Sequence, residues 1–272
     1  MAVGHISPML LTSARWTVAS ALLIVIANRH IRDDWPVIRA NLPYLFMMGA
    51  TGFAVFNILF YVSLQYTTAI NVTILQAAMP MFIFTLNFAA FRTRPHWGQI
   101  VGYTLTLVGV LLTAAAGDLS SLLVLDINRG DLIMSVAALV YAGYSVALAA
   151  KPKMHWLSFL TALVVSASIA GIIMALYEST TPQFLWPSTV TGWAVVAYTA
   201  IFASIIAQGF YIRGVELLGG NRASLFLNLV PIFGALLSVL VLGEALHLYH
   251  AVALALVIGG IFLAQHLQNK AL

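Results

Sequence analysis

The chain contains no cysteine and very few charged residues. Its 272 residues are 62% hydrophobic and 7% charged, whereas soluble domains carry about a quarter charged residues. Without cysteine, disulfides and thiolate metal sites are excluded, and the redox compartment stays undetermined. So few charges cannot cover an aqueous surface, so lipid must contact most of the exterior. A soluble enzyme is therefore excluded, and the net charge of +4 does not indicate a nucleic-acid partner.

The longest uncharged stretch distinguishes helices from a barrel. No Asp, Glu, Lys or Arg occurs between Arg39 and Arg92. A bilayer accepts only helices or closed barrels, and this stretch lacks the alternation of barrel strands. A helix needs about 20 residues to cross a hydrocarbon core of about 30 Å. The stretch therefore predicts two helical spans joined by a turn at Gln65-Tyr66-Thr67-Thr68.

The span-length rule predicts an all-α polytopic transmembrane bundle with no extramembrane domain. The longest connections, 29–42, 117–130 and 178–189, are polar or contain proline. The nine expected spans are 8–28, 43–63, 70–91, 97–116, 131–150, 156–177, 190–212, 223–242 and 246–267.

The basic residues predict the orientation, because loops rich in Lys and Arg remain cytoplasmic. Ten of the twelve fall on one side, and Arg15 and Arg129 fall on the other. We expect a bacterial cytoplasmic (inner) membrane, a cytoplasmic C-terminus, an outside N-terminus and no cleaved signal peptide. The ten are Arg29, Arg32, Arg39, Arg92, Arg94, Lys151, Lys153, Arg213, Arg222 and Lys270.

A weak internal repeat appears when the sequence is shifted by 151 residues. It pairs the first four spans with the last four and leaves 131–150 unmatched. We therefore expect two five-helix repeats, 1–118 and 129–268, inverted because an odd number of crossings reverses direction. The first repeat then lacks its first helix, and a misplaced start codon is our preferred explanation. The coincident pairs are Phe60 with Tyr211, Pro80 with Pro231, Phe82 with Phe233 and Gly109 with Gly260.

Three stretches of the sequence follow a recognisable order. Arg129-Gly130-Asp131-Leu132 leads into a helix with Ala142 and Tyr144. Gly220-Asn221-Arg222-Ala223-Ser224 precedes Pro231, and Leu242-Gly243-Glu244-Ala245-Leu246 precedes Gly259-Gly260. Together these stretches resemble the drug/metabolite transporter superfamily, and we identify the chain as similar to its EamA-type members.

The resemblance implies ten helices in two inverted five-helix repeats. It also implies cytoplasmic termini and export or exchange of amino acids or other metabolites. The chain departs from the pattern in two places. Its first helix is absent, and Arg92-Thr93-Arg94 replaces the glutamate expected in the first hairpin.

Two prolines lie near the middle of equivalent spans. Pro80 and Pro231 each remove a backbone hydrogen bond and free a carbonyl, at Gln76 and Leu227. They are candidate gating kinks, and the alternative is that they only set helix packing.

Uncharged polar side chains inside the spans are the candidate substrate contacts. Amides and phenols can hold a small metabolite without the cost of a buried charge, although interhelical bonding is the alternative for each. Within the set, Asn57 and Tyr61 share one helix face, as do Gln208 and Tyr211. The selected residues are Asn57, Tyr61, Gln76, Tyr144, Gln208, Tyr211 and Asn228; Asn87 and Tyr141 are of the same kind.

Arg15 is the ionisable residue deepest in a span. It could attract a carboxylate, but we expect it to extend to the outer interface. No ionisable residue is predicted to be buried at mid-span, so a proton remains only a candidate coupling ion.

These patterns favour a secondary active transporter, an exporter or exchanger of small metabolites that works by alternating access. No catalytic, cofactor or metal residue is predicted. The alternative is an integral membrane enzyme with an interfacial site near Glu244, His247 and His250, whose spacing disfavours a metal. An assembly protein is disfavoured by the short loops. A homodimer remains a candidate, although Gly98-xxx-Gly102 favours internal packing over a dimer face.

Overall fold

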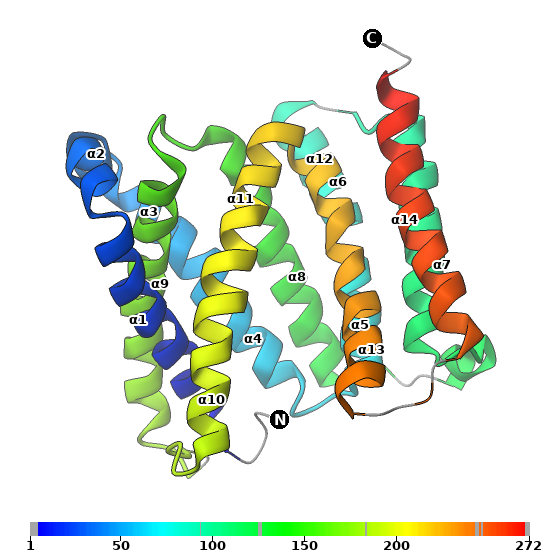
Figure 1. The fold of residues 1–272 in the computed structure, drawn as a ribbon, viewed down its shortest axis with the longest axis horizontal. Coiled ribbons are helices and arrows are strands. Elements are labelled where there is room, and N and C mark those ends of the chain that lie inside the picture. The colour runs from blue at the N-terminus through cyan, green and yellow to red at the C-terminus, as the bar shows by residue number, and fades with distance from the viewer. Residues whose placement is uncertain are drawn as a thin grey trace. The chain divides into compact units, whose positions relative to one another are not determined.

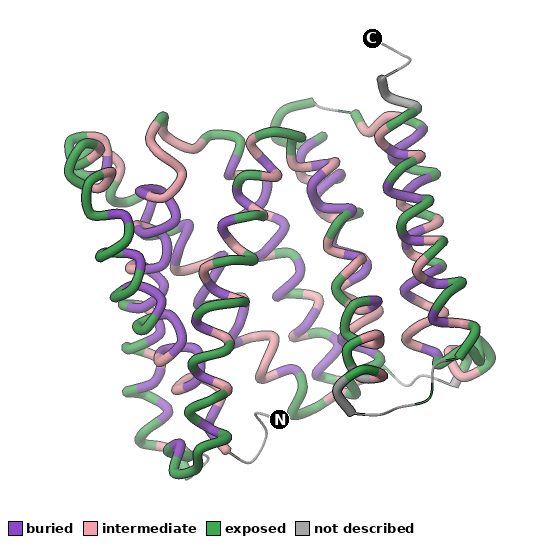
Figure 2. The backbone as a smooth tube through the Cα atoms, viewed as in Figure 1, coloured by how far each residue is buried: buried purple, intermediate pink, exposed green. Residues whose placement is uncertain are grey.

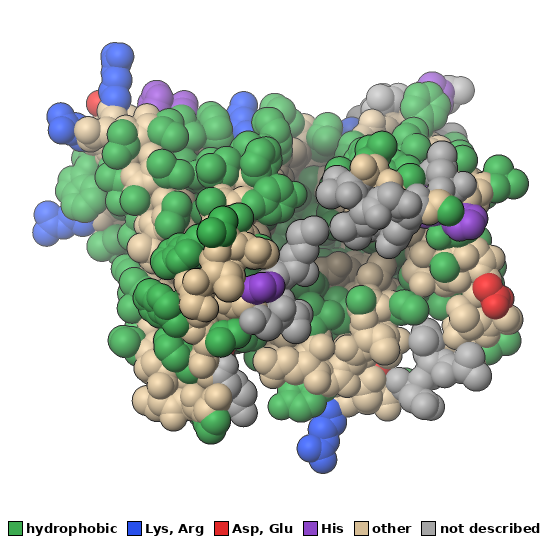
Figure 3. Space-filling model, turned by 60° about the horizontal axis from the view of Figure 1, so that its bottom comes forward, with side chains coloured by type: hydrophobic (Ala, Val, Ile, Leu, Met, Phe, Trp, Pro, Cys, Tyr) green, Lys and Arg blue, Asp and Glu red, His purple; other side chains and the backbone are tan. Residues whose placement is uncertain are grey.

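The computed structural model describes residues 5–92, 94–124, 127–182, 184–242, 245 and 247–269. These residues form helices and connections without a strand. Nine helical stretches within them are long and apolar enough to cross a membrane, which confirms the predicted fold class. Hydrophobic side chains cover much of the face in Figure 3. The spans are Pro8–Ile26, Leu42–Ser63, Ala69–Phe91, Trp97–Ala114, Arg129–Ala150, Trp156–Glu178, Val190–Leu218, Gly220–Leu237 and Leu248–His266.

The connection predicted over 29–42 is instead mostly helical. Helix α2 spans Asn28–Ala40. Ile31, Trp35 and Ile38 recur at helical spacing and line an apolar pocket, while the basic side chains of α2 are exposed. Such an amphipathic helix is typical of a membrane interface. Helix α2 was not predicted from the sequence, because its segment is too polar to span a bilayer.

The helices form two compact units. The first combines residues 1–62 with 147–217, so it contains segments far apart in sequence. Figure 1 shows its helix α1 running beside α9. Its elements are α1 (Pro8–Ile26), α2, α3 (Leu42–Gly49), the π-helix η1 (Ala50–Val55), α4 (Phe56–Ser63), the 3-10 turn η3 (Leu148–Ala150), α9 (Trp156–Glu178), α10 (Val190–Tyr198), the π-helix η4 (Thr199–Ile206) and α11 (Ala207–Leu218).

Small and hydroxyl-bearing residues let α1 and α9 approach closely. The hydroxyls of Thr17 and Ser168 lie 2.8 Å apart. A Cβ on Gly171 would lie 3.1 Å from the Cα atom of Ser13. Figure 2 shows buried and exposed residues alternating along the helices, as expected where one face meets protein and the other meets lipid.

The second unit combines residues 63–146 with 218–272. Its main contact joins α7 and α14, which run side by side in Figure 1. A Cβ on Gly102 would lie 2.4 Å from the carbonyl oxygen of Gly260, and one on Gly260 would lie 2.5 Å from that of Gly102. Gly102 thus serves internal packing. The elements are α5 (Ala69–Ala77), α6 (Met79–Phe91), α7 (Trp97–Ala114), the 3-10 helix η2 (Leu119–Val124), α8 (Arg129–Ala147), α12 (Gly220–Leu225), the 3-10 turn η5 (Phe226–Asn228), α13 (Leu229–Leu242) and α14 (Leu248–Asn269).

Within each unit, the helices that pack most closely are partners in the 151-residue repeat. The shift places α1 on α9 and α7 on α14. The hydroxyl pair between α1 and α9 consists of residues 151 positions apart. The same shift converts the Gly102–Gly260 contact into that of Ala253 with Gly109, whose added Cβ would lie 2.9 Å from the Ala253 carbonyl oxygen. Interchanged contacts of this kind are expected from an inverted repeat.

Helix irregularities also recur at the repeat interval. Shifting η1 by 151 residues places it inside η4, so both repeats contain a π-helix at the same position. The two prolines lie just after helix breaks. Pro80 follows the break between α5 and α6, and Pro231 follows the 3-10 turn η5. The missing N–H of proline and the widened turn of a π-helix are both recognised causes of helix bending.

Candidate functional site

Arg15 on α1 lies inside the first unit and is 4% exposed. Its Nε donates a hydrogen bond to the Ser204 hydroxyl at 2.9 Å. Its Nη1 donates to the Asn57 side-chain oxygen at 3.2 Å and to the Tyr61 hydroxyl at 3.1 Å. The expectation that Arg15 extends to the outer interface is therefore wrong. Three neutral acceptors from two other spans hold the guanidinium inside the unit.

The π-helices fix the direction of two of these acceptors. The Asn57 amide nitrogen donates to the Phe53 carbonyl of η1 at 2.5 Å, which turns its side-chain oxygen toward Arg15. The Ser204 hydroxyl donates to the Thr199 carbonyl of η4 at 2.9 Å, five residues earlier. Its lone pairs are then left for the Arg15 Nε. π-Helical turns inside α-helices are frequent at functional sites, and irregular backbone at membrane depth occurs where it is buried in protein or lines a cavity.

No described carboxylate forms an ion pair with Arg15. Glu178, a buried acid of the same unit, is already satisfied at the first turn of α1. It accepts hydrogen bonds from the Ser7 hydroxyl at 2.7 Å, the Met9 N–H at 3.2 Å and the Leu10 N–H at 2.8 Å. Glu178 therefore caps a helix and leaves the Arg15 charge uncompensated.

An aromatic stack lies against the guanidinium. The Arg15 Cζ atom is 4.7 Å from the Trp16 ring centre. Trp16 is fully buried, and its ring stacks on Phe53 at a centroid distance of 4.7 Å and an interplanar angle of 7°. We call Arg15, Trp16, Asn57, Tyr61 and Ser204 the Arg15 cluster.

The remaining predicted contacts of the first unit lie on α11. Gln208 and Tyr211 are partly buried, and the Gln208 side-chain oxygen is enclosed without a hydrogen-bond partner among the described residues. Of the predicted contacts in the first unit, only Asn57 and Tyr61 form hydrogen bonds with Arg15.

The other predicted contacts, Gln76, Tyr144 and Asn228, lie in the second unit. Gln76 is partly buried beside the helix break at Ala78, and Tyr144 is buried against Tyr141 at 5.6 Å between ring centroids. Asn228 is buried, and its amide donates to the Thr106 hydroxyl of α7 at 2.7 Å. For Asn228 the structure thus shows interhelical bonding, the alternative considered above.

Sequence reasoning missed a second polar cluster, around Asp131 at the start of α8. The Asp131 carboxylate accepts hydrogen bonds from the Thr67 hydroxyl at 2.6 Å and from the Asn71 amide at 3.0 and 3.1 Å. It also accepts one from the Asn128 backbone N–H at 2.9 Å. Asp three residues after Asn128 was the available signal, because this spacing is that of a capping pair.

The interfacial site of the alternative enzyme hypothesis lies partly outside the described residues, because Glu244 is not among them. His250 is buried and bonds to the backbone of His247, while His247 itself is exposed. Within the described ranges, no group of three His, Asp or Glu side chains could hold a metal ion.

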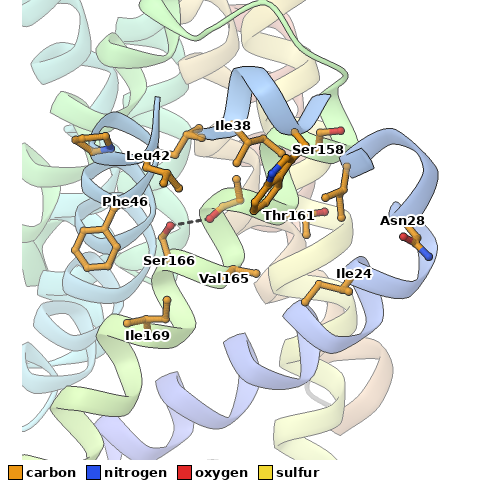
Figure 4. A pocket seen from close by; sticks show the side chains of 15 residues that line it. Ile24, Asn28, Ile38, Leu42, Phe46, Ser158, Thr161, Val165, Ser166 and Ile169 are labelled. Carbon is orange, nitrogen blue, oxygen red and sulfur yellow. Dashed lines mark hydrogen bonds between the residues drawn. The ribbon is translucent and has the colours of Figure 1, made fainter. Parts of the chain in front are cut away.

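The first unit also contains an apolar pocket of about 680 Å³ between α1, α2, α3 and α9. Figure 4 shows Ile38, Leu42 and Phe46 at this pocket, with Thr161 and Ser166 of α9. The Ser166 hydroxyl is not available to a ligand as a donor, because it bonds to the Ala162 carbonyl at 2.7 Å. None of the predicted substrate contacts lines this pocket.

Comparisons with known proteins place these features in a family context. The chain matches the EamA-like transporter family over residues 1–115 and 128–265. It is 28% identical to the uncharacterized transporter YyaM of Bacillus subtilis, covering 96% of this chain and 86% of YyaM. It is 25% identical to the uncharacterized inner membrane transporter YicL of Salmonella typhimurium, covering 89% of this chain and 80% of YicL. A protein of known crystal structure has the same fold, with a TM-score of 0.80, 19% identity, and coverage of 98% of this chain and 90% of that chain.

Proposed function

Because the chain belongs to the EamA-like transporter family, we propose that it is a secondary active transporter that exports or exchanges small metabolites such as amino acids. Transport proceeds by alternating access between two inverted repeats, 1–118 and 129–268. The protein lies in the cytoplasmic membrane with its C-terminus in the cytoplasm, as the distribution of Lys and Arg favours.

The Arg15 cluster is the observation that carries this proposal. An uncompensated cation inside a transmembrane bundle is costly, and such residues mark substrate or ion pathways. Arg15 meets both conditions, because it is 4% exposed and has only neutral hydrogen-bond partners among the described residues. A bundle with a purely structural role would gain nothing from this charge.

Bending elements support an alternating mechanism. The π-helices η1 and η4 and the breaks before Pro80 and Pro231 occur at repeat-related positions. Discontinuous helices are a common feature of secondary transporters. Pro80 and Pro231 act as gating kinks, and the substrate contacts are Asn57, Tyr61, Gln76, Tyr144, Gln208, Tyr211 and Asn228.

Counterflow into proteoliposomes tests the proposal. Vesicles containing the purified protein are loaded with an unlabelled mixture of amino acids, amines and nucleosides, and uptake of each labelled compound is followed. Saturable uptake above that of protein-free vesicles is expected for at least one class, and its response to a pH gradient tests proton coupling. Absence of exchange across the whole panel would contradict the proposal.

A further inference from the structure

We propose that the Arg15 cluster binds the carboxylate of a monoanionic or zwitterionic substrate. This inference rests on the proposed function and names the chemical class that the transporter recognises. It concerns Arg15 and Tyr61, which are joined by a hydrogen bond inside the first unit.

The positive charge of Arg15 has no counter-ion among the described residues. An arginine guanidinium stays protonated in proteins. The three described partners of Arg15 are two hydroxyls and an amide, so none supplies a negative charge. A buried cation needs a counter-ion or becomes a large energetic cost. A bound anion would supply the compensation that the described residues do not.

The Arg15 cluster contains more hydrogen-bond donors than described acceptors. The Arg15 Nη2 forms no hydrogen bond with any described residue and is not fully enclosed. Tyr61 accepts from Arg15 through its oxygen, which leaves the phenolic proton to be donated elsewhere. The missing partner is therefore an acceptor with more than one oxygen.

The charge of the ligand distinguishes a carboxylate from a phosphate. Both match the planar donor groups of arginine. A phosphate monoester carries a charge of about −1.5 to −2 at pH 7, which the single positive charge of the cluster cannot neutralise. A carboxylate carries one negative charge and two acceptor oxygens. It leaves the site neutral.

Ligand-dependent thermal stability of the purified full-length protein tests this inference without requiring transport. The probes are amino acids and 2-oxo acids, the primary amides of the same compounds, and phosphate monoesters. At least one carboxylate should raise the Tm, because a ligand that binds the folded state stabilises it. Its amide and the phosphate esters should not.

The key variant is Arg15→Gln, and Arg39→Gln is the matched control on exposed α2. Arg15→Gln should weaken carboxylate binding by at least about tenfold, without lowering the Tm of the ligand-free protein. Arg15→Lys should recover part of the binding because it restores the charge but not the planar donor geometry. Arg39→Gln should behave as wild type. A merely structural Arg15 would instead lower the ligand-free Tm when replaced.

Several outcomes would overturn the inference. One is that no carboxylate raises the wild-type Tm; another is that amides or phosphate esters do so equally well. A third is that Arg15→Gln retains full carboxylate binding. Counterflow of amines or nucleosides without any carboxylate would contradict the inference and leave the proposed transport function standing.

Discussion

At the scale of single residues, His155 links the start of α9 to pH. Its Nδ1 accepts the Leu157 N–H at 3.2 Å, and its backbone N–H donates to Asp34 at 2.9 Å. Its ring stacks on His30 at a centroid distance of 3.7 Å. Burial lowers the pKa of His155, and the nearby His30 and Arg213 lower it further against the opposing effects of Asp34 and Glu216. The neutral imidazole is the form that can cap the helix.

We predict that acidification destabilises the protein through His155. Because its pKa is lower in the folded state than in the unfolded state, its contribution is present above the unfolded value and lost as the pH falls through the folded one. His155→Asn keeps an acceptor at the cap and should flatten the fall in Tm between about pH 7 and pH 5. His96→Asn, at the equivalent cap of α7, should retain the wild-type acid sensitivity. An unchanged pH profile in His155→Asn would contradict this assignment.

At the scale of elements, the α7–α14 contact depends on the absence of side chains. An added Cβ on Gly102 would meet backbone and Ala264, neither of which can move away cheaply. We expect Gly102→Ala to destabilise the protein by about 1–3 kcal/mol.

Gly143→Ala is the matched helical control, because no atom lies within 4 Å of its added Cβ. It should be neutral or stabilising by up to about 1 kcal/mol. Thermal unfolding in detergent measures both variants. Equal Tm values for the two would show that α7 and α14 do not pack as described.

The helix breaks give a second prediction at this scale. Alanine at Pro80 or Pro231 restores a backbone N–H and allows a more continuous helix. If these prolines act as gating kinks, each variant should exchange substrate more slowly without a lower Tm. Pro152→Ala, in a connection outside the spans, is the control. Wild-type exchange rates in both span variants would favour packing as the role of the prolines.

At the scale of the whole molecule, the natural absence of cysteine makes the orientation directly testable. Ser121→Cys and Lys153→Cys place single thiols in two connections, at a partly exposed and an exposed position respectively. We expect a membrane-impermeant maleimide to label Ser121→Cys in intact cells and to label Lys153→Cys only after permeabilisation. The reverse pattern would place the C-terminus outside.

The number and approximate positions of the spans could be predicted because they depend on length and hydropathy, which are local properties. Helix α2 was missed because its segment is too polar to span a bilayer, although Ile31, Trp35 and Ile38 recur at helical spacing. Only part of the Arg15 cluster could be predicted from the sequence. Asn57 and Tyr61 share a face by their spacing, but their meeting with Arg15 depends on contacts between spans, including one with Ser204. Helical periodicity describes the faces of one span at a time, so it cannot predict a contact between spans.

The pairing of α7 with α14 has a consequence for biosynthesis. Gly260 lies 158 positions after Gly102, and at 5–20 residues per second the ribosome needs about 8–30 s to make this stretch. Throughout that interval the glycine face of α7 has not met its partner. The nascent second unit therefore stays incomplete until its last helix has been synthesised, and a stop codon before α14 would leave a bundle with an open seam.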